Sequence, residues 1–365
     1  MVKLDKIQIH GFKSIKDREV ELRDLNVLIG PNGGGKSNFI GIFTFLHYLI
    51  DDYLQLYIGQ SGGADNLLHF GSKTTDCLHF HLFFGLREYV CTLVPSADDT
   101  LVFADEYAFL KEDEQDDNPR SSFRTTAGYK ESFLLSHSED FNDDIASSIL
   151  EFIRSWKVYH FHDTSTTAKV RKLCNINDNT YLRENASNLS AYLYMLKERY
   201  KGHYKNIVDT IRLVSPFFDD FLLAPSRLNP EMINLEWKQK GSDAYFDATS
   251  LSDGTMRFIC LATLLLQPEL PGVLLIDEPE LGLHPYVLTV LAELLKLASE
   301  KAQIIVGTQS VTLVNQFAPE DVLVVEMEGN ETVMKRLSSG DLSDWLEDYT
   351  LGELWEKNVF GGRPK

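Results

Sequence analysis

The sequence predicts an α/β protein with a P-loop NTPase fold, and three observations support this fold class. Residues 30–37 follow the pattern G-x-x-x-x-G-K-[ST] and lie between an apolar strand and an apolar helix. A second apolar run, 273–276, ends in two acids, Asp277 and Glu278. From residue 251 onward strands and helices alternate, which is typical of a parallel sheet covered by helices.

The first elements along the chain are short strands that lead to the P-loop. Residues 3–22 alternate apolar and polar side chains like a pair of strands, and residues 25–29 form a compact apolar strand. After the glycine-rich loop, residues 38–50 have the apolar density of a buried helix. Three strand-like runs within 77–109, separated by turn-forming residues, predict a β-meander.

The middle of the chain is expected to be an insertion between two halves of one domain. Residues 112–122 concentrate acidic, proline and serine residues and predict an exposed loop. Helical spacing is found at 142–156 and 188–214. Beyond residue 251, we expect helices at 253–266, 285–299 and 311–316, with strands at 273–276, 304–306 and 322–325. The expected division is a head made of 1–84 and 246–365, with 85–245 as a β-meander and mainly helical insertion.

Composition limits the possible partners. The 365 residues are 44% apolar and 24% charged, which is typical of a globular protein. Thirty-five Lys and Arg against 54 Asp and Glu give a net charge of −19, which disfavours duplex binding by the whole surface. Four scattered cysteines form no CxxC pair. The longest apolar stretch, 39–50, is too short to span a membrane, and no signal-peptide pattern is present, so a cytoplasmic location and no membrane partner are expected.

The glycine-rich loop predicts a nucleotide site. Glycines allow consecutive backbone N–H groups to surround phosphate oxygens, while the following helix adds a positive partial charge. Lys36 would reach the β- and γ-phosphates, and the Ser37 hydroxyl would bind Mg²⁺. The residues expected to bind ATP here are Gly30, Pro31, Asn32, Gly33, Gly34, Gly35, Lys36, Ser37 and Asn38.

The acidic pair that ends the apolar run 273–276 complements this loop. Asp277, at the carboxyl end of the strand, is expected to bind Mg²⁺. Glu278 is placed to orient and deprotonate the attacking water. An acidic pair at a strand end is common alone, and its meaning here comes from its combination with the P-loop.

A third motif specifies the class of ATPase. Residues 251–255, Leu-Ser-Asp-Gly-Thr, open a helix ahead of Asp277 and resemble the LSxGx signature of ABC-type ATPases. In that family the signature faces the γ-phosphate bound by the other subunit. The resemblance therefore implies that Ser252 and Gly254 bind nucleotide in trans, in a homodimer or a higher even oligomer with ATP and Mg²⁺ between heads.

Further residues resemble one branch of this family. Residues 277–285 read DEPELGLHP, and together with Gly11-Phe12-Lys13-Ser14 and Asn38 they resemble the branch containing RecF, SMC, Rad50 and OLD-type ATPases. The resemblance covers about residues 1–80 and 245–330, without a TOPRIM nuclease or a long coiled coil. It implies an ATPase that acts with a separately encoded effector, such as a nuclease in antiviral defence.

One position departs from the pattern of this branch. Its switch histidine follows the strand after the acidic pair, whereas this sequence has Gln309. Glutamine can contact a γ-phosphate oxygen or a water but carries no positive charge, so slow hydrolysis is expected. Gln60 is the candidate for the glutamine of the Q-loop, with a simple turn residue as the alternative, and Lys13 is a further site candidate.

Two groups of residues, one basic and one aromatic, could form surfaces for partners. Lys169, Arg171 and Lys172 could bind nucleic-acid phosphates, or they could form a solvated face. Near the chain end, Trp355 and Phe360 are expected to be exposed and to dock on the parent domain or a partner. Two alternative functions therefore stay open: a DNA repair or chromosome-maintenance ATPase, and a nucleotide-gated assembly module with negligible turnover.

Overall fold

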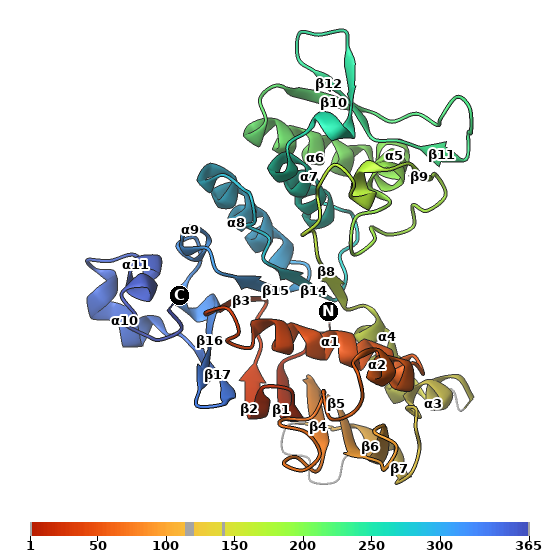
Figure 1. Ribbon diagram of the computed structural model, residues 1–365, viewed down its shortest axis with the longest axis vertical. Helices are drawn as coiled ribbons and strands as arrows, with labels where there is room; N and C mark the ends of the chain where they lie inside the picture. The colour runs from red at the N-terminus through yellow and green to blue at the C-terminus, as the bar shows by residue number, and fades with distance from the viewer. Residues whose placement is uncertain (1, 114–119, 141–142, 364–365) are drawn as a thin grey trace.

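Two six-stranded sheets, with helix α1 between them, form the centre of the molecule (Figure 1). The computed structural model describes residues 2–113, 120–140 and 143–363. One sheet is antiparallel and the other is mostly parallel. A second lobe, which contains α5, α6 and α7, lies on the other side of the parallel sheet from α1 (Figure 1).

The antiparallel sheet comes from the first third of the chain. Its order is β2-β1-β4-β5-β6-β7, and every neighbouring pair is antiparallel. Alternation places Ile7 and Ile9 of β1 in the core while their neighbours are less buried. The strands are β1 (Lys6–Phe12), β2 (Ile15–Glu21), β4 (Leu78–Phe84), β5 (Arg87–Pro95), β6 (Leu101–Leu110) and β7 (Arg120–Thr126).

The second sheet holds the predicted site strands and is parallel except for β17. Its order is β17-β16-β3-β15-β14-β8. The strands are continuously apolar because both faces are covered: Val27 and Ile29 pack into one core cluster and Leu28 into the other. The strands are β3 (Leu25–Ile29), β8 (Lys157–Tyr159), β14 (Val273–Asp277), β15 (Gln303–Thr308), β16 (Val322–Glu328) and β17 (Glu331–Arg336).

Helices cover both faces of this parallel sheet. On the side of the antiparallel sheet are α1 (Lys36–Ile50), α2 (Leu54–Gln60), α3 (Leu134–Asp140) and α4 (Asp144–Arg154). The other side and the second lobe contain α5 (Leu189–Arg199), α6 (Lys201–Val214), α7 (Asp253–Leu265) and α8 (Pro285–Ser299). Short helices α9 (Val311–Val314), α10 (Ser339–Leu346) and α11 (Leu351–Glu356) lie near the C-terminus. None of the helices in the described residues is long and apolar enough to cross a membrane.

Short strands and 3-10 turns complete the second lobe. A three-stranded sheet of order β10-β12-β13 and the pair β11-β9 pack with α5 and α6. These strands are β9 (Cys174–Asn175), β10 (Phe218–Leu222), β11 (Met232–Ile233), β12 (Glu236–Gln239) and β13 (Tyr245–Asp247). The 3-10 turns are η1 (Lys169–Arg171), η2 (Ala248–Ser250) and η3 (Pro319–Asp321).

The expected boundaries of the insertion need correction. A boundary at residue 84 falls between β4 and β5, which pair directly within one sheet. The segment 85–245 is also interrupted by β8, which pairs with β14 in the central sheet. Residues 85–154 therefore extend the first lobe, and the separate lobe begins only after β8, because strand pairing across the chain decides which elements share a core.

Two local expectations were also wrong. Residues 120–122 of the expected loop belong to β7, while residues 114–119 lie outside the described part. Trp355 is completely buried rather than exposed, which agrees with docking on the parent domain, and its Nε1 donates to the Gly362 backbone oxygen at 2.5 Å. Phe360 is partly buried against the same core.

Candidate functional site

The P-loop connects the end of β3 to the start of α1. Gly35 caps the helix with a φ of 110°, and a Cβ at this position would collide with the Thr332 side chain. Lys36 is buried, and its Nζ donates to the backbone oxygens of Gly30 at 2.7 Å and Pro31 at 3.1 Å. Burial lowers the Lys36 pKa, while nearby acidic side chains, Asp277 foremost, act in the opposite direction.

The structure places Ser37 against Asp277, as a magnesium site requires. Ser37 Oγ donates to Asp277 Oδ2 at 3.2 Å. The other carboxylate oxygen, Oδ1, is buried without a hydrogen-bond partner, and burial raises the pKa of Asp277. A hydroxyl beside a buried carboxylate with a free oxygen fits the hard oxygen ligands that Mg²⁺ prefers. These residues therefore fit the metal that the sequence implies.

Glu278 and Gln309 are in direct contact because their strands are neighbours. Parallel pairing of β14 with β15 sets Asp277 opposite Gly307, so the residues that follow each strand meet at one edge. Gln309 Nε2 donates to Glu278 Oε1 at 2.5 Å, and the Gln309 backbone N–H donates to Glu280 Oε1 at 2.7 Å. Glu278 has a φ of 48°, a left-handed conformation that is uncommon for a residue with a side chain.

The signature residues begin α7 on the second lobe. Ser252 is the N-cap, with its Oγ accepting from the Thr255 backbone N–H at 3.2 Å, and its side chain is exposed. Gly254 lies against the loop after β14, where an added Cβ would collide with the Gly282 carbonyl oxygen. Within the described part of the chain, the hydrogen bonds of Ser252 stay in the first turn of α7. The signature is therefore open to a ligand from outside the chain.

Two other predicted site residues are Asn38 in α1 and Lys13 in the turn between β1 and β2. Asn38 Nδ2 donates to Ser14 Oγ at 2.6 Å, and Ser14 shares a 2.7 Å hydrogen bond with Thr332. Asn38 thus ties the β1–β2 turn to α1. Lys13 in that turn is half-buried, lies over the Phe12 ring, and has its pKa lowered by burial. It forms no ion pair with any residue that the structure describes.

Two predictions are not supported by the geometry. Gln60 is an exposed residue at the end of α2 and makes no hydrogen bond to a site residue within the described chain. Arg171 is buried, so it cannot belong to an exposed phosphate-binding surface with Lys169 and Lys172. Its guanidinium donates hydrogen bonds to four groups inside the protein.

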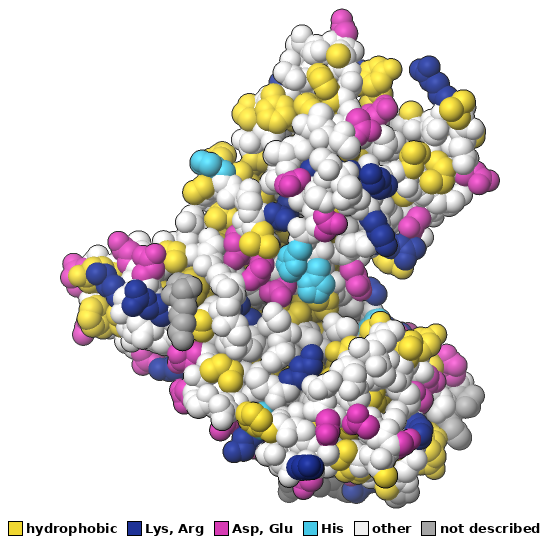
Figure 2. Space-filling view, viewed as in Figure 1, with side chains coloured by type: hydrophobic (Ala, Val, Ile, Leu, Met, Phe, Trp, Pro, Cys, Tyr) yellow, Lys and Arg dark blue, Asp and Glu magenta, His cyan; other side chains and the backbone are white. Residues whose placement is uncertain are grey.

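Sequence reasoning missed two histidines beside Asp277. His160 and His162 follow β8, whose pairing with β14 brings them to the same sheet edge as Asp277. His162 Nε2 donates to the Asp277 backbone oxygen at 3.1 Å, and burial lowers the pKa of His160. Figure 2 shows histidine and acidic side chains together near the centre of this face. The only signal was His-Phe-His after a three-residue strand, which is too short for reliable recognition from its pattern.

The fold and this set of residues define an ABC-type ATPase of the branch that contains SMC and RecF proteins. The chain belongs to the family described as "AAA domain, putative AbiEii toxin, Type IV TA system", whose model matches residues 25–315. A comparison with curated proteins finds no match.

Solved structures similar to this chain include two SMC head domains. One, the SmcHead bound to the C-winged helix domain of ScpA, has a TM-score of 0.62 and 17% identity, over 94% of this chain and 99% of that one. The other, the Smc head domain with an extended coiled coil bound to the C-terminal domain of ScpA from Pyrococcus furiosus, has a TM-score of 0.59 and 15% identity, over 95% and 99%. At these identities the likeness shows the fold.

Proposed function

We propose that this protein binds ATP with Mg²⁺ and hydrolyses it in sites shared between two copies. The observation that carries this proposal is the meeting of Lys36, Ser37 and Asp277 at one sheet edge, with Glu278 next in the chain. The signature Ser252, exposed and bonded only within its own helix turn, would complete the site of the partner copy. Two heads would then enclose two nucleotides.

The roles of the residues follow from their contacts. Lys36 now donates to two loop carbonyls, and the β- and γ-phosphates would replace these as its acceptors. Ser37 and Asp277 would hold Mg²⁺, which neutralises phosphate charge when it is bound. Glu278 would accept a proton from the attacking water, and its contact with Gln309 fixes the direction of its carboxylate.

The same contact favours a second candidate function, a nucleotide-gated assembly module with negligible turnover. The Glu278 oxygen that accepts the hydrogen bond from Gln309 has one lone pair fewer with which to take a proton from water. In this alternative, ATP joins two heads and is released without being hydrolysed. Both functions share the composite site and differ only in the rate of the chemical step.

We further propose that the nucleotide state controls a separately encoded effector, such as a nuclease in antiviral defence. The family description names a putative toxin of a toxin–antitoxin system, and both similar SMC heads are bound to ScpA. Direct action on DNA in repair or chromosome maintenance is the less favoured function, because burial of Arg171 removes the centre of the basic patch.

Turnover of the wild type and of Glu278→Gln distinguishes these functions. We expect Glu278→Gln to bind ATP and dimerise but to lose about 10² to 10⁴-fold in turnover, the usual range for a general base. Phosphate release, nucleotide binding and light scattering measure the three properties. If neither protein hydrolyses ATP although both bind it and dimerise, the assembly module is correct. If neither dimerises with ATP, both functions are wrong.

A further inference from the structure

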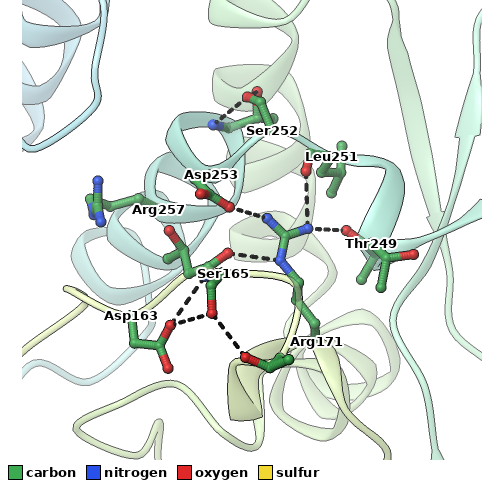
Figure 3. A network of polar contacts seen from close by, with 12 residues as sticks. Asp163, Ser165, Arg171, Thr249, Leu251, Ser252, Asp253 and Arg257 are labelled. Carbon is green, nitrogen blue, oxygen red and sulfur yellow. Dashed lines mark hydrogen bonds and ion pairs between the residues drawn. The ribbon is translucent and has the colours of Figure 1, made fainter.

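Arg171, at the end of η1, is a fully buried cation that contacts the turn leading into the signature helix. Its side chain has no exposed surface. Nη2 donates to the Asp253 carboxylate at 2.9 Å, and Nη1 donates to the Leu251 backbone oxygen at 3.0 Å and to the Ala248 oxygen. Figure 3 shows the guanidinium directed at this turn. A planar guanidinium can bind several acceptors at once in a fixed geometry.

These contacts surround Ser252 without touching it. Leu251 and Asp253 are its two chain neighbours, and Ala248 begins η2, the turn that leads to the signature. Ser252 keeps an exposed hydroxyl, while the residues on either side are fixed to a buried group. Arg171 therefore sets the position of the signature serine through its backbone, without contacting its exposed side chain.

A further contact of the Arg171 guanidinium connects it to the segment beside Asp277 of the same chain. Arg171 Nε donates to the Thr164 backbone oxygen at 2.8 Å, in the segment that follows β8. Two residues earlier, His162 contacts the Asp277 backbone oxygen. Arg257 of the signature helix also donates to the backbone oxygens of Phe161 and His162, both at 2.8 Å. If Arg171 acts on the nucleotide site of its own chain, it does so through Thr164 and His162. If it acts on the site of the partner copy, it does so through Ser252.

We propose that Arg171 is a positioning residue for ATP hydrolysis, and that it acts on the site of the partner copy by preordering the Ser252 turn. This inference rests on the proposed composite site. The exposed turn is fixed by a buried side chain from a different segment, so ordering is complete before the partner's γ-phosphate arrives. Arg171 itself does not touch the nucleotide.

Arg171→Met tests the role, because methionine keeps much of the volume and removes every donor. We expect turnover and ATP-dependent dimerisation to fall, with turnover reduced about 10²-fold as for other misplaced site groups. Binding of ATP to the monomer, which uses the intact P-loop, should not change. Arg227→Met, the same change at an exposed arginine of this lobe, is the matched control. Arg171→Lys provides a milder variant if the methionine protein unfolds.

Mixing variants separates action in trans from action in cis. A mixed dimer of Lys36→Ala and Arg171→Met has one site with both changes and one site with neither. We expect mixing to restore turnover to at most about half of the wild-type value, since each mixed dimer has one intact site of two. Lys36→Ala mixed with Ser252→Glu is the reference for a signature defect and should behave alike.

Each result of the mixing experiment is decisive. Restoration with both Arg171→Met and Ser252→Glu supports the inference. Restoration with Ser252→Glu alone means that Arg171 acts on its own chain's site, and overturns the inference while the composite site stands. Restoration with neither contradicts the composite site itself, and the proposed function fails together with the inference. Loss of monomer ATP binding in Arg171→Lys would also overturn the inference.

Discussion

At the residue scale, Gln309 determines the orientation of the proposed catalytic base. It holds Glu278 through its side chain and Glu280 through its backbone N–H, so only the side-chain contact is lost in Gln309→Ala. A hydrogen bond to a charged group contributes about 1.5–3 kcal/mol, so we expect turnover to fall about 10 to 100-fold with little change in KM. Gln239→Ala, at an exposed glutamine, is the control. A rise in turnover would mean that Gln309 restrains Glu278 instead.

The buried carboxyl of Asp277 predicts how Mg²⁺ binding depends on pH. Burial raises its pKa, so the metal-free folded protein binds this proton more tightly than the unfolded chain does. The stability from this protonation is present below the unfolded pKa and is lost as pH rises through the folded pKa. Mg²⁺ needs the carboxylate, so its affinity should weaken as pH falls toward that value.

Thermal unfolding with and without Mg²⁺ measures this dependence. We expect a smaller Mg²⁺-induced rise in Tm at about pH 5.5 than at about pH 7.5, because protons compete for the same oxygens. Asp277→Asn should lose the Mg²⁺ effect at both pH values. An equal rise in Tm for the wild type at both pH values would contradict competition at Asp277.

The residues that were predictable from sequence are those whose roles depend on local spacing. Lys36, Ser37 and Asp277 belong to short patterns that fix a strand, a loop and a helix together, and the structure brings Ser37 into contact with Asp277 and Lys36 within its electrostatic influence. Arg171 was assigned to an exposed surface because the sequence around a basic residue does not distinguish an exposed patch from a buried hydrogen-bond network. Its burial depends on acceptors near residue 250, which no local pattern connects to it.

At the element scale, the C-terminal helices support the segment that carries Gln309. Trp355 of α11 is buried, and the Gly352 backbone N–H of α11 donates to Asn315 Oδ1, just after α9, at 2.6 Å. We expect Trp355→Ala to lower the free energy of unfolding by about 3–5 kcal/mol, as for other large core truncations. Guanidinium unfolding gives this value, and Trp345→Ala, at an exposed site, should have little effect. A loss below about 1 kcal/mol would show that α11 is not part of the cooperative core.

Strand pairing explains which elements could be predicted. The paired strands in 3–22 and the alternating elements after residue 251 follow local periodicity and were confirmed. The position of β8 was not predictable, since three residues carry little periodic signal and its place depends on pairing with β14. This strand brings His160 and His162 to the site. Because β8 was not predicted, neither histidine could be assigned to the site.

At the scale of the whole molecule, the net charge of −19 opposes the association of two heads. ATP adds negative charge to each head, and Mg²⁺ and Lys36 offset only the local part of it. Salt screens this repulsion, with a Debye length of about 10 Å at 0.1 M. Dimerisation driven by contacts at two nucleotide sites should therefore become stronger as salt rises, whereas binding of a basic surface to DNA should become weaker.

The Glu278→Gln protein with ATP and Mg²⁺ allows this salt dependence to be measured at equilibrium, since turnover is removed. We expect the dissociation constant of its dimer to fall several-fold when salt is raised from about 0.05 M to about 0.3 M, a range in which the Debye length shortens more than twofold. Sedimentation at several protein concentrations gives the constant, and Lys36→Ala should remain monomeric throughout. A dimer that weakens steadily with salt would instead require attraction between opposite charges across the interface, and would place basic residues such as Lys169 and Lys172 against an acidic surface of the partner copy.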